Sequence, residues 1–162
     1  MKVFISGSRS ISCLNYTLNN LNGNEVLIGD CYGIDLAVQT YLKSLNYPFV
    51  TVYHINSHPR NNVGNWQTHR IRATSYTAKD IAMTSDCDAG IVIWDGMSKG
   101  SLSNIHRLLT AHKPLMLCYN GVCDTITSLS EFNLIQQGLT NGKTTGIIPS
   151  YSVGRDLSDY NG

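Results

Sequence analysis

The sequence predicts a doubly wound α/β domain, in which helices flank both faces of a parallel sheet of about five strands. Short apolar runs of strand type alternate along the chain with amphipathic stretches of helical period. Several of these runs are apolar at nearly every position, as in strands that are buried on both faces. Glycines mark three of the turns that lead from a strand towards a helix, where the backbone must turn sharply.

Five runs rich in apolar, β-branched or aromatic residues are predicted to be strands. They lie at residues 2–6, 25–28, 49–53, 89–94 and 115–119. Right-handed crossovers favour a doubly wound sheet. If its strand order is three, two, one, four, five, the order reverses between the first and fourth strands. Such sheets bind ligands at the carboxyl ends of the strands, where the strand order reverses. We therefore expect a ligand site between the first and fourth strands.

Helical spacing and capping residues predict five helices. The first begins at Ser12, carries Leu14, Leu18 and Leu21 on one face, and ends before Gly23. The other helices are predicted at about 34–45, 77–86, 101–112 and 126–139. The pair Asn120-Gly121 is expected to form a turn after the fifth strand.

Residues 54–76 follow neither period and form the longest irregular segment. The segment either closes over a ligand or is a solvated loop or subunit contact. Guanidinium groups fit phosphates and aromatic rings stack on bases, so the candidates for a lid are Arg60, Trp66, Arg70 and, further along, Lys79. The three histidines of the segment lack metal-ligand spacing, and we expect no metal site.

The totals favour a small ligand over a polymer. With a net charge of +1 and only 14% charged residues, the chain is poorly suited to bind duplex nucleic acid by charge. No apolar run approaches the roughly 20 residues of a membrane span, and the first run reaches Gly7 too early for a secretory signal. We therefore expect a cytoplasmic protein with one domain at residues 1–142. The polar, glycine-containing residues 143–162 are typical of a loosely attached tail.

The cysteines are expected to be reduced. There are five of them, which leaves one unpaired in any disulfide framework, and no C-x-x-C spacing occurs. We predict neither a disulfide nor a zinc site among Cys13, Cys31, Cys87, Cys118 and Cys123.

Three glycine-containing loops follow the first, second and fourth strands and should gather at one end of the sheet. Free amides and the dipole of the helix after the third loop favour phosphate, with Arg9 and Lys99 as cationic partners. The full set of predicted ligand-binding residues is Gly7, Ser8, Arg9, Gly29, Asp30, Tyr32, Gly33, Asp35, Trp94, Asp95, Gly96, Ser98, Lys99, Gly100, Ser101 and Asn104.

Four motifs in register resemble the SLOG superfamily, the Rossmann-like group named for Smf/DprA and Lonely Guy proteins. The motifs are Ile5-Ser6-Gly7-Ser8-Arg9, Gly29-Asp30-Cys31-Tyr32-Gly33-Ile34-Asp35, Lys79-Asp80-Ile81-Ala82-Met83 and Trp94-Asp95-Gly96-Met97-Ser98-Lys99-Gly100-Ser101. The chain looks most like the small stand-alone members related to YspA and YpsA, over about residues 1–119. The resemblance implies a pocket for a nucleotide or nucleotide-derived ligand. In such a pocket Asp30 or Asp35 would bind ribose, and Tyr32, Trp66 or Trp94 would contact the base. Members cleave nucleoside monophosphates, sense ADP-ribose-type signals or bind single-stranded DNA, so the fold alone does not choose the function.

One departure from the family pattern favours binding over catalysis. The hydrolases of the superfamily place a catalytic glutamate where this chain has Asn104, and an amide cannot exchange a proton near neutral pH. We expect a protein that binds an ADP-ribose-like or nucleoside monophosphate-like molecule, as a sensor or by sequestration, as a homo-oligomer and without a cofactor. The alternative is a nucleotide N-glycosidase that uses Asp30 or Asp35 as its carboxylate. A further alternative is single-stranded nucleic-acid binding.

Overall fold

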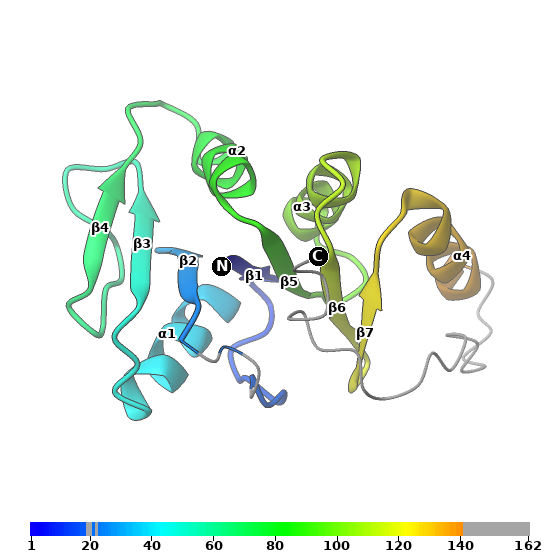
Figure 1. The fold of residues 1–162 in the computed structure, drawn as a ribbon, viewed down its shortest axis with the longest axis horizontal. Coiled ribbons are helices and arrows are strands. Elements are labelled where there is room, and N and C mark those ends of the chain that lie inside the picture. Colours follow the sequence, from blue (N-terminus) through cyan, green and yellow to red (C-terminus); the bar gives the residue numbers. More distant parts are fainter. Residues whose placement is uncertain (19–20, 22, 141–162) are drawn as a thin grey trace.

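The computed structural model describes residues 1–18, 21 and 23–140 of the chain. These residues form one seven-stranded sheet with helices packed on both of its faces (Figure 1). The strands are β1 (Lys2–Gly7), β2 (Glu25–Gly29), β3 (Val50–His54), β4 (Gln67–Arg70), β5 (Ala89–Ile93), β6 (Leu115–Tyr119) and β7 (Val122–Ile126). The helices are α1 (Ile34–Ser44), α2 (Thr77–Asp86), α3 (Lys99–Thr110) and α4 (Leu129–Thr140). The predicted tail at 143–162 lies outside the described residues.

The sheet has the order β4-β3-β2-β1-β5-β6-β7, and only the β6–β7 pair is antiparallel. This confirms the doubly wound α/β class, and the five central strands have the order that places the reversal between the first and fourth predicted strands. The chain runs outward from β1 to β4 and then crosses to β5, on the other side of β1. The order therefore reverses between β1 and β5, where such a sheet binds ligands.

Helix α1 lies on one face of the sheet, and α2, α3 and α4 lie on the other (Figure 1). An apolar core fills the space on each face. Ile34 and Leu42 of α1 pack on one face, and Met83 of α2, Leu108 of α3 and Phe132 of α4 pack on the other. Neighbouring residues of the central strands alternate between the two cores, because successive side chains of a strand point to opposite faces. Burial on both faces explains why these strands are continuous apolar runs.

The predicted helix at 12–21 is wrong, since residues 12–18 form no helix. Serine, asparagine and threonine residues, which favour local side-chain to backbone hydrogen bonds over helix, interrupt this segment. Leu18 and Leu21 are nevertheless buried in the core beside α1, with Leu14 and Tyr16 packed against it. These apolar side chains therefore pack in the core without helical backbone.

A hairpin replaces the predicted start of the last helix. Asn120 and Gly121 have φ angles of 50° and 81°, which is the conformation of a tight two-residue hairpin turn. The chain therefore returns along β6 as β7, and α4 begins only at Leu129. The mixed exposure of β7, with polar residues at two of its five positions, hides this edge strand from a search for apolar runs.

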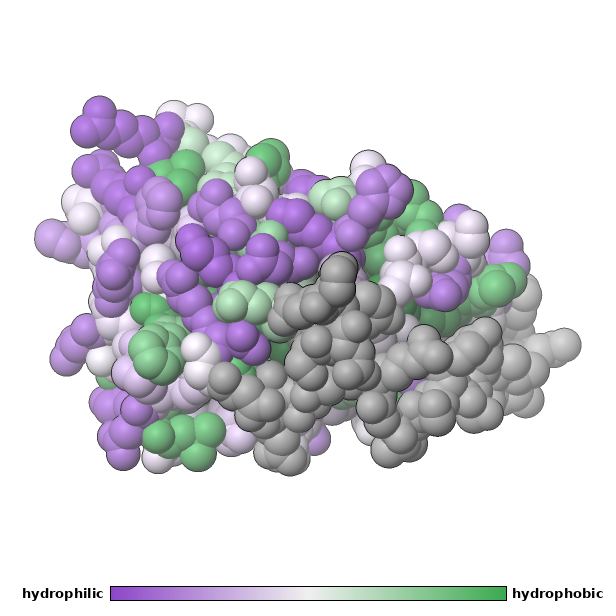
Figure 2. Space-filling view, in the orientation of Figure 1, coloured by the Kyte–Doolittle hydropathy of each residue, from purple (hydrophilic) through white to green (hydrophobic). Residues whose placement is uncertain are grey.

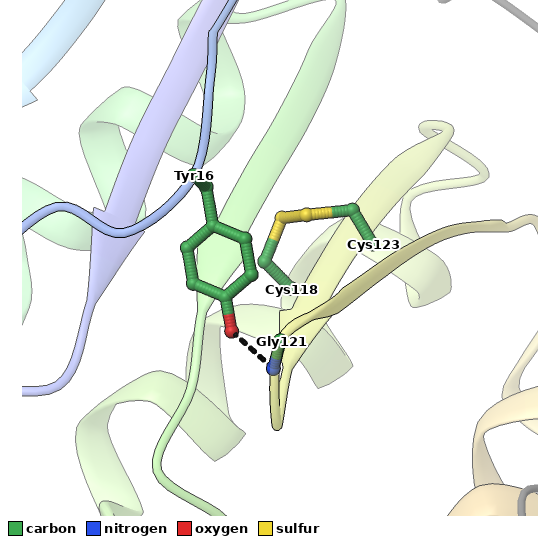
Figure 3. The surroundings of a disulfide bond; sticks show 4 residues. All are labelled: Tyr16, Cys118, Gly121 and Cys123. Atoms are coloured by element: carbon green, nitrogen blue, oxygen red, sulfur yellow. Dashed lines mark hydrogen bonds between the residues drawn. A yellow bond between two sulfur atoms is a disulfide. The ribbon is translucent and has the colours of Figure 1, made fainter.

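The hairpin also corrects the prediction of reduced cysteines, because Cys118 and Cys123 form a disulfide (Figure 3). Pairing of Tyr119 with Val122 beside the turn places the two cysteines directly opposite each other, with Cα atoms 4.1 Å apart. The hydroxyl of Tyr16 accepts a hydrogen bond of 3.0 Å from the Gly121 amide and fastens the turn to the rest of the domain. The spacing C-x₄-C with an intervening Asn-Gly was the signal in the sequence. Free thiols remain at Cys13, Cys31 and Cys87.

Helices in the described part of the chain are all too short or too polar to cross a bilayer. Figure 2 shows one face of the molecule, on which the surface over β4 and α2 is mostly hydrophilic. Apolar residues outside the grey atoms of this view form small, separate patches. Patches of this kind are ordinary on a folded domain and identify no partner surface, so the homo-oligomer stays a prediction.

Candidate functional site

The loops after β1 and β5 join at the point where the strand order reverses. Ser8, which follows β1 and is fully buried, donates its amide to the Ile93 carbonyl at 3.0 Å. Its hydroxyl accepts a hydrogen bond from the Asp95 amide at 3.0 Å and lies 3.4 Å from the hydroxyl of Ser101. These contacts bring the predicted first and third loops together at the start of α3.

Glycines allow the close approach of the loops. A Cβ atom at Gly7 would lie 2.5 Å from the carbonyl oxygen of Ile93 and 2.7 Å from a side-chain atom of Ile34. Gly33 has a φ of 77°, and a Cβ atom there would lie 2.5 Å from the Cα of Arg9. The second loop therefore packs directly against the backbone of the first. The predicted glycines act here through packing and turning, and this leaves their contact with a ligand as a prediction.

A buried ionic cluster forms the floor of the second loop. The side chain of Asp30 is completely buried, and its Oδ1 lies 2.7 Å from a guanidinium nitrogen of Arg60 and 2.9 Å from Nζ of Lys79. Its Oδ2 accepts hydrogen bonds from the amide and Nε of Arg60. Burial raises the pKa of Asp30, but the hydrogen bonds from Arg60 and Lys79 outweigh it and hold the pKa well below its usual value.

The arrangement revises the expected role of Asp30. Both of its oxygens are used within the protein, so Asp30 anchors the irregular segment and does not face a ribose. Arg60 pairs with this buried carboxylate, and its guanidinium lies 4.4 Å above the ring of Tyr76. Its closure over a ligand stays a prediction. Lys79 also reaches the site, but as a buried partner of Asp30 rather than as part of a lid.

Gln39 of α1 joins the second loop to the irregular segment by hydrogen bonds, and it was absent from the predicted residues. Its buried side chain donates to the carbonyl oxygen of Gly29 at 2.9 Å and accepts from the amide of Val63 at 3.2 Å. Asn61 donates to the carbonyl oxygen of Asp30. The signal for Gln39 was its position one helical turn after Asp35, on the same side of α1.

Asp35 is the acid of the second loop that stays partly open to solvent, with 13% of its side chain exposed. Its Oδ2 accepts a hydrogen bond from the Cys31 amide at 3.1 Å and lies 3.9 Å from Nζ of Lys79. Burial raises the pKa of Asp35 to about 6, although Lys79 and the Cys31 amide oppose the shift. Burial likewise raises the pKa of Asp80, which follows Lys79 in α2.

Asn104 lies buried at the centre of a polar contact between β1, α2 and α3. Its amide nitrogen donates to the hydroxyl of Ser6 at 3.2 Å and lies 3.5 Å from a carboxylate oxygen of Asp80. Its Oδ1 accepts a hydrogen bond of 2.7 Å from Arg107. Arg107 was absent from the predicted residues, and its position three residues after Asn104 was the signal for this contact.

The loop before α3 holds a carboxylate where a phosphate was expected. Oδ1 of Asp95 accepts the amides of Met97 at 2.9 Å and Ser98 at 2.7 Å, and its Oδ2 accepts the hydroxyl of Ser10 at 2.6 Å. Partial burial raises the pKa of Asp95, but these hydrogen bonds lower it to about 2 overall. Ser98 caps the helix by accepting the Ser101 amide. The amides of Lys99 and Gly100 have no acceptor among the described residues, and both residues are exposed.

Of the two tryptophans predicted at the site, Trp94 is buried behind the third loop, where its indole nitrogen donates to the carbonyl oxygen of Ser98 at 3.1 Å, and Trp66 lies elsewhere. Trp94 is 4% exposed and fills the core, with its ring 5.9 Å from Phe132 and 6.0 Å from Tyr119. Trp66 precedes β4 and therefore lies at the amino end of the sheet, where its indole nitrogen donates to the carbonyl oxygen of Tyr47. It lines a separate cavity of about 370 Å³ there.

The remaining predicted residues lie at the carboxyl end of the sheet and differ in their exposure to solvent. Arg9 and Lys99 are exposed, and Tyr32 is 63% exposed. Gly96 has a φ of 81° and packs against the ring of Tyr119. Arg70 ends β4 and is exposed, but β3 and β2 separate its strand from β1.

Comparison of the chain with protein-family models found no match, and comparisons with curated proteins and with solved structures found no significant match. Among the described residues, no three His, Cys, Asp or Glu side chains are grouped so that they could hold a metal ion. The function is therefore argued from the geometry of the loops and from the chemistry of their side chains.

Proposed function

We propose that this protein binds a small, phosphorylated, nucleotide-derived molecule at the carboxyl ends of β1, β2 and β5. The observation that carries the proposal is the joining of the loops at the reversal point through Ser8, Asp95 and Ser101. Around this junction, Arg9 and Lys99 project into solvent, and the first amides of α3 are available. Guanidinium, ammonium and helix amides are the usual partners of a phosphate group.

Asp35 and Tyr32 are the best candidates for the nucleoside part. Among the described residues, only one oxygen of Asp35 has a hydrogen-bond partner, so the other can accept a ribose hydroxyl. Tyr32 lies between Asp30 and Gly33 in the same loop and exposes most of its ring, which can stack on a base. Asp30 and Trp94, which are buried and already paired, take no part in this proposal.

Binding without cleavage, as a sensor or by sequestration, is the form of the proposal that Asn104 supports. Its side chain is hydrogen-bonded at both ends, to Ser6 and to Arg107, and it supplies no titratable proton. The resemblance to SLOG proteins, which four motifs in register carry, fits a nucleotide-derived ligand.

A second candidate function is cleavage of an N-glycosidic bond. The observation in its favour is the pair of carboxyl groups at Asp35 and Asp80, whose pKa values burial raises. Carboxyl groups with raised pKa values can act as general acids. Incubation with AMP and with NAD distinguishes the two functions: release of free base by the wild type, but not by Asp35→Asn, would show that the protein is an enzyme.

Titration calorimetry with ADP-ribose and AMP tests the binding proposal. We expect at least one of them to bind, and Arg9→Ala to weaken that binding by about tenfold, as expected for the loss of a charged hydrogen bond. Lys43→Ala is the matched control, because Lys43 is an exposed cation in the last turn of α1, at the opposite end of the sheet. Equal effects of the two substitutions would contradict the proposed location. The mass of a small molecule released from the purified protein by denaturation would identify the natural ligand.

A further inference from the structure

Asp95 occupies the donors that a phosphate would ordinarily use in this loop. One carboxylate oxygen accepts two successive backbone amides, those of Met97 and Ser98, and the other accepts the hydroxyl of Ser10 from the first loop. Backbone amides before a helix, together with a hydroxyl group, form a common binding arrangement for an anion. The protein thus carries its own anion beside the free amides of α3.

The charge of this internal anion is not cancelled by the buried cations of the site. Arg60 and Lys79 are both engaged with Asp30, and Lys79 also lies near Asp35. Hydrogen bonds to Asp95 come from two neutral amides and a neutral hydroxyl, so its full negative charge remains. A phosphate that enters next to the amides of α3 therefore meets a fixed negative charge.

We propose that Asp95 makes the site select a phosphodiester or diphosphate-bridged nucleotide over a terminal phosphomonoester. The inference rests on the proposed function and names the class of ligand for that site. A phosphomonoester carries about −1.5 to −2 charges near pH 7, whereas each phosphorus of a diester or diphosphate bridge carries one. The additional charge at a distance of about 4 Å from a carboxylate costs on the order of a tenfold loss of affinity or more.

The substitution Asp95→Asn removes the charge with little change in shape. The asparagine carbonyl oxygen can still accept the amides of Met97 and Ser98, because this local turn is made equally by aspartate and asparagine. Asp88→Asn is the matched control. Asp88 is an exposed aspartate immediately before β5, at the amino end of the sheet, where it accepts the amide of Lys2.

The test compares two ligands that differ in the charge of one group, AMP and its methyl phosphodiester, by calorimetry at pH 7.5 and constant salt. We expect Asp95→Asn to tighten AMP binding by about tenfold and binding of the methyl ester by threefold or less, with Asp88→Asn unchanged for both. Equal effects on the two ligands, or no effect on either, would overturn the inference while leaving the proposed function in place. If neither ligand binds to the wild type or to Asp95→Asn, the proposed function fails and this inference fails with it.

Discussion

Lys79 and Asp30 are 49 residues apart in the sequence, yet Nζ of Lys79 lies 2.9 Å from Oδ1 of Asp30, with 5% and 0% of the two side chains exposed. This pair joins the first turn of α2 to the end of β2. Arg60 completes the cluster and ties the irregular segment to the same carboxylate. The candidate site therefore lies beside a buried ionic cluster, in which Asp30 is paired with cations of the protein itself.

Loss of Lys79 should destabilise the fold. Removal of one partner of a buried ion pair leaves a charge with too little compensation and costs about 3 kcal/mol or more. We expect Lys79→Met to lower the free energy of unfolding in urea by that amount. Lys2→Met is the control, since Lys2 and Glu25 form an exposed pair at 3.9 Å, and its loss should cost less than about 1 kcal/mol. Equal stability of the two variants would show that the cluster contributes little.

Asp35 should make stability depend on pH. Its pKa is raised from 3.8 to about 6 in the folded protein, so the neutral form stabilises the fold below pH 4, and this contribution is lost as the pH rises through 6. The unfolding free energy of the wild type relative to Asp35→Asn should therefore fall between pH 4 and 7, by up to about 3 kcal/mol. Asp95→Asn, at a group with a pKa of about 2, should show little such change. A constant difference for Asp35→Asn would argue against the raised pKa.

The position of Trp66 predicts that ligand affinity is insensitive to its replacement. Trp66→Phe removes the hydrogen bond from its indole nitrogen to the carbonyl oxygen of Tyr47 and should cost about 1 kcal/mol of stability. Affinity for a nucleotide should stay within twofold of wild type, since the ring lies at the amino end of the sheet. A large loss of ligand affinity in a folded Trp66→Phe variant would show that Trp66 belongs to the ligand site.

The disulfide of the β6–β7 hairpin should contribute about 2 kcal/mol to stability, since it closes a short loop. Cys123→Ser should lose this contribution, and reduction of the wild type by dithiothreitol should have the same effect. Cys13→Ser is the control, because Cys13 is an exposed free thiol. If Cys123→Ser is as stable as Cys13→Ser, the cross-link is absent or without effect.

The central strands could be predicted from the sequence, whereas the edge strands could not. Residues of β1, β2 and β5 are apolar because helices cover both faces of them. All four residues of β4 are polar and exposed, and the strand is defined only by the pairing of its backbone with β3. Such a strand has no apolar or alternating side-chain pattern from which the sequence could predict it.

The gathering of the loops followed from the parallel order of the strands, but the roles of the acids did not. Asp30 and Asp35 lie in one loop. Because Arg60 pairs with Asp30, only Asp35 is left available to a ligand. That choice depends on the path of an irregular segment. The same path, through β4, places Trp66 at the opposite end of the sheet, where sequence alone could not assign it.

Chemical-shift mapping of the labelled protein by NMR during titration with ADP-ribose tests the central claim most directly. We predict saturable shifts that are largest for the backbone amides of Ser8, Arg9, Lys99 and Gly100, with no comparable shift of the Trp66 indole. Shifts concentrated around Trp66 and Tyr47, or no saturable shift at the amides of α3, would contradict a ligand site at the carboxyl ends of β1, β2 and β5.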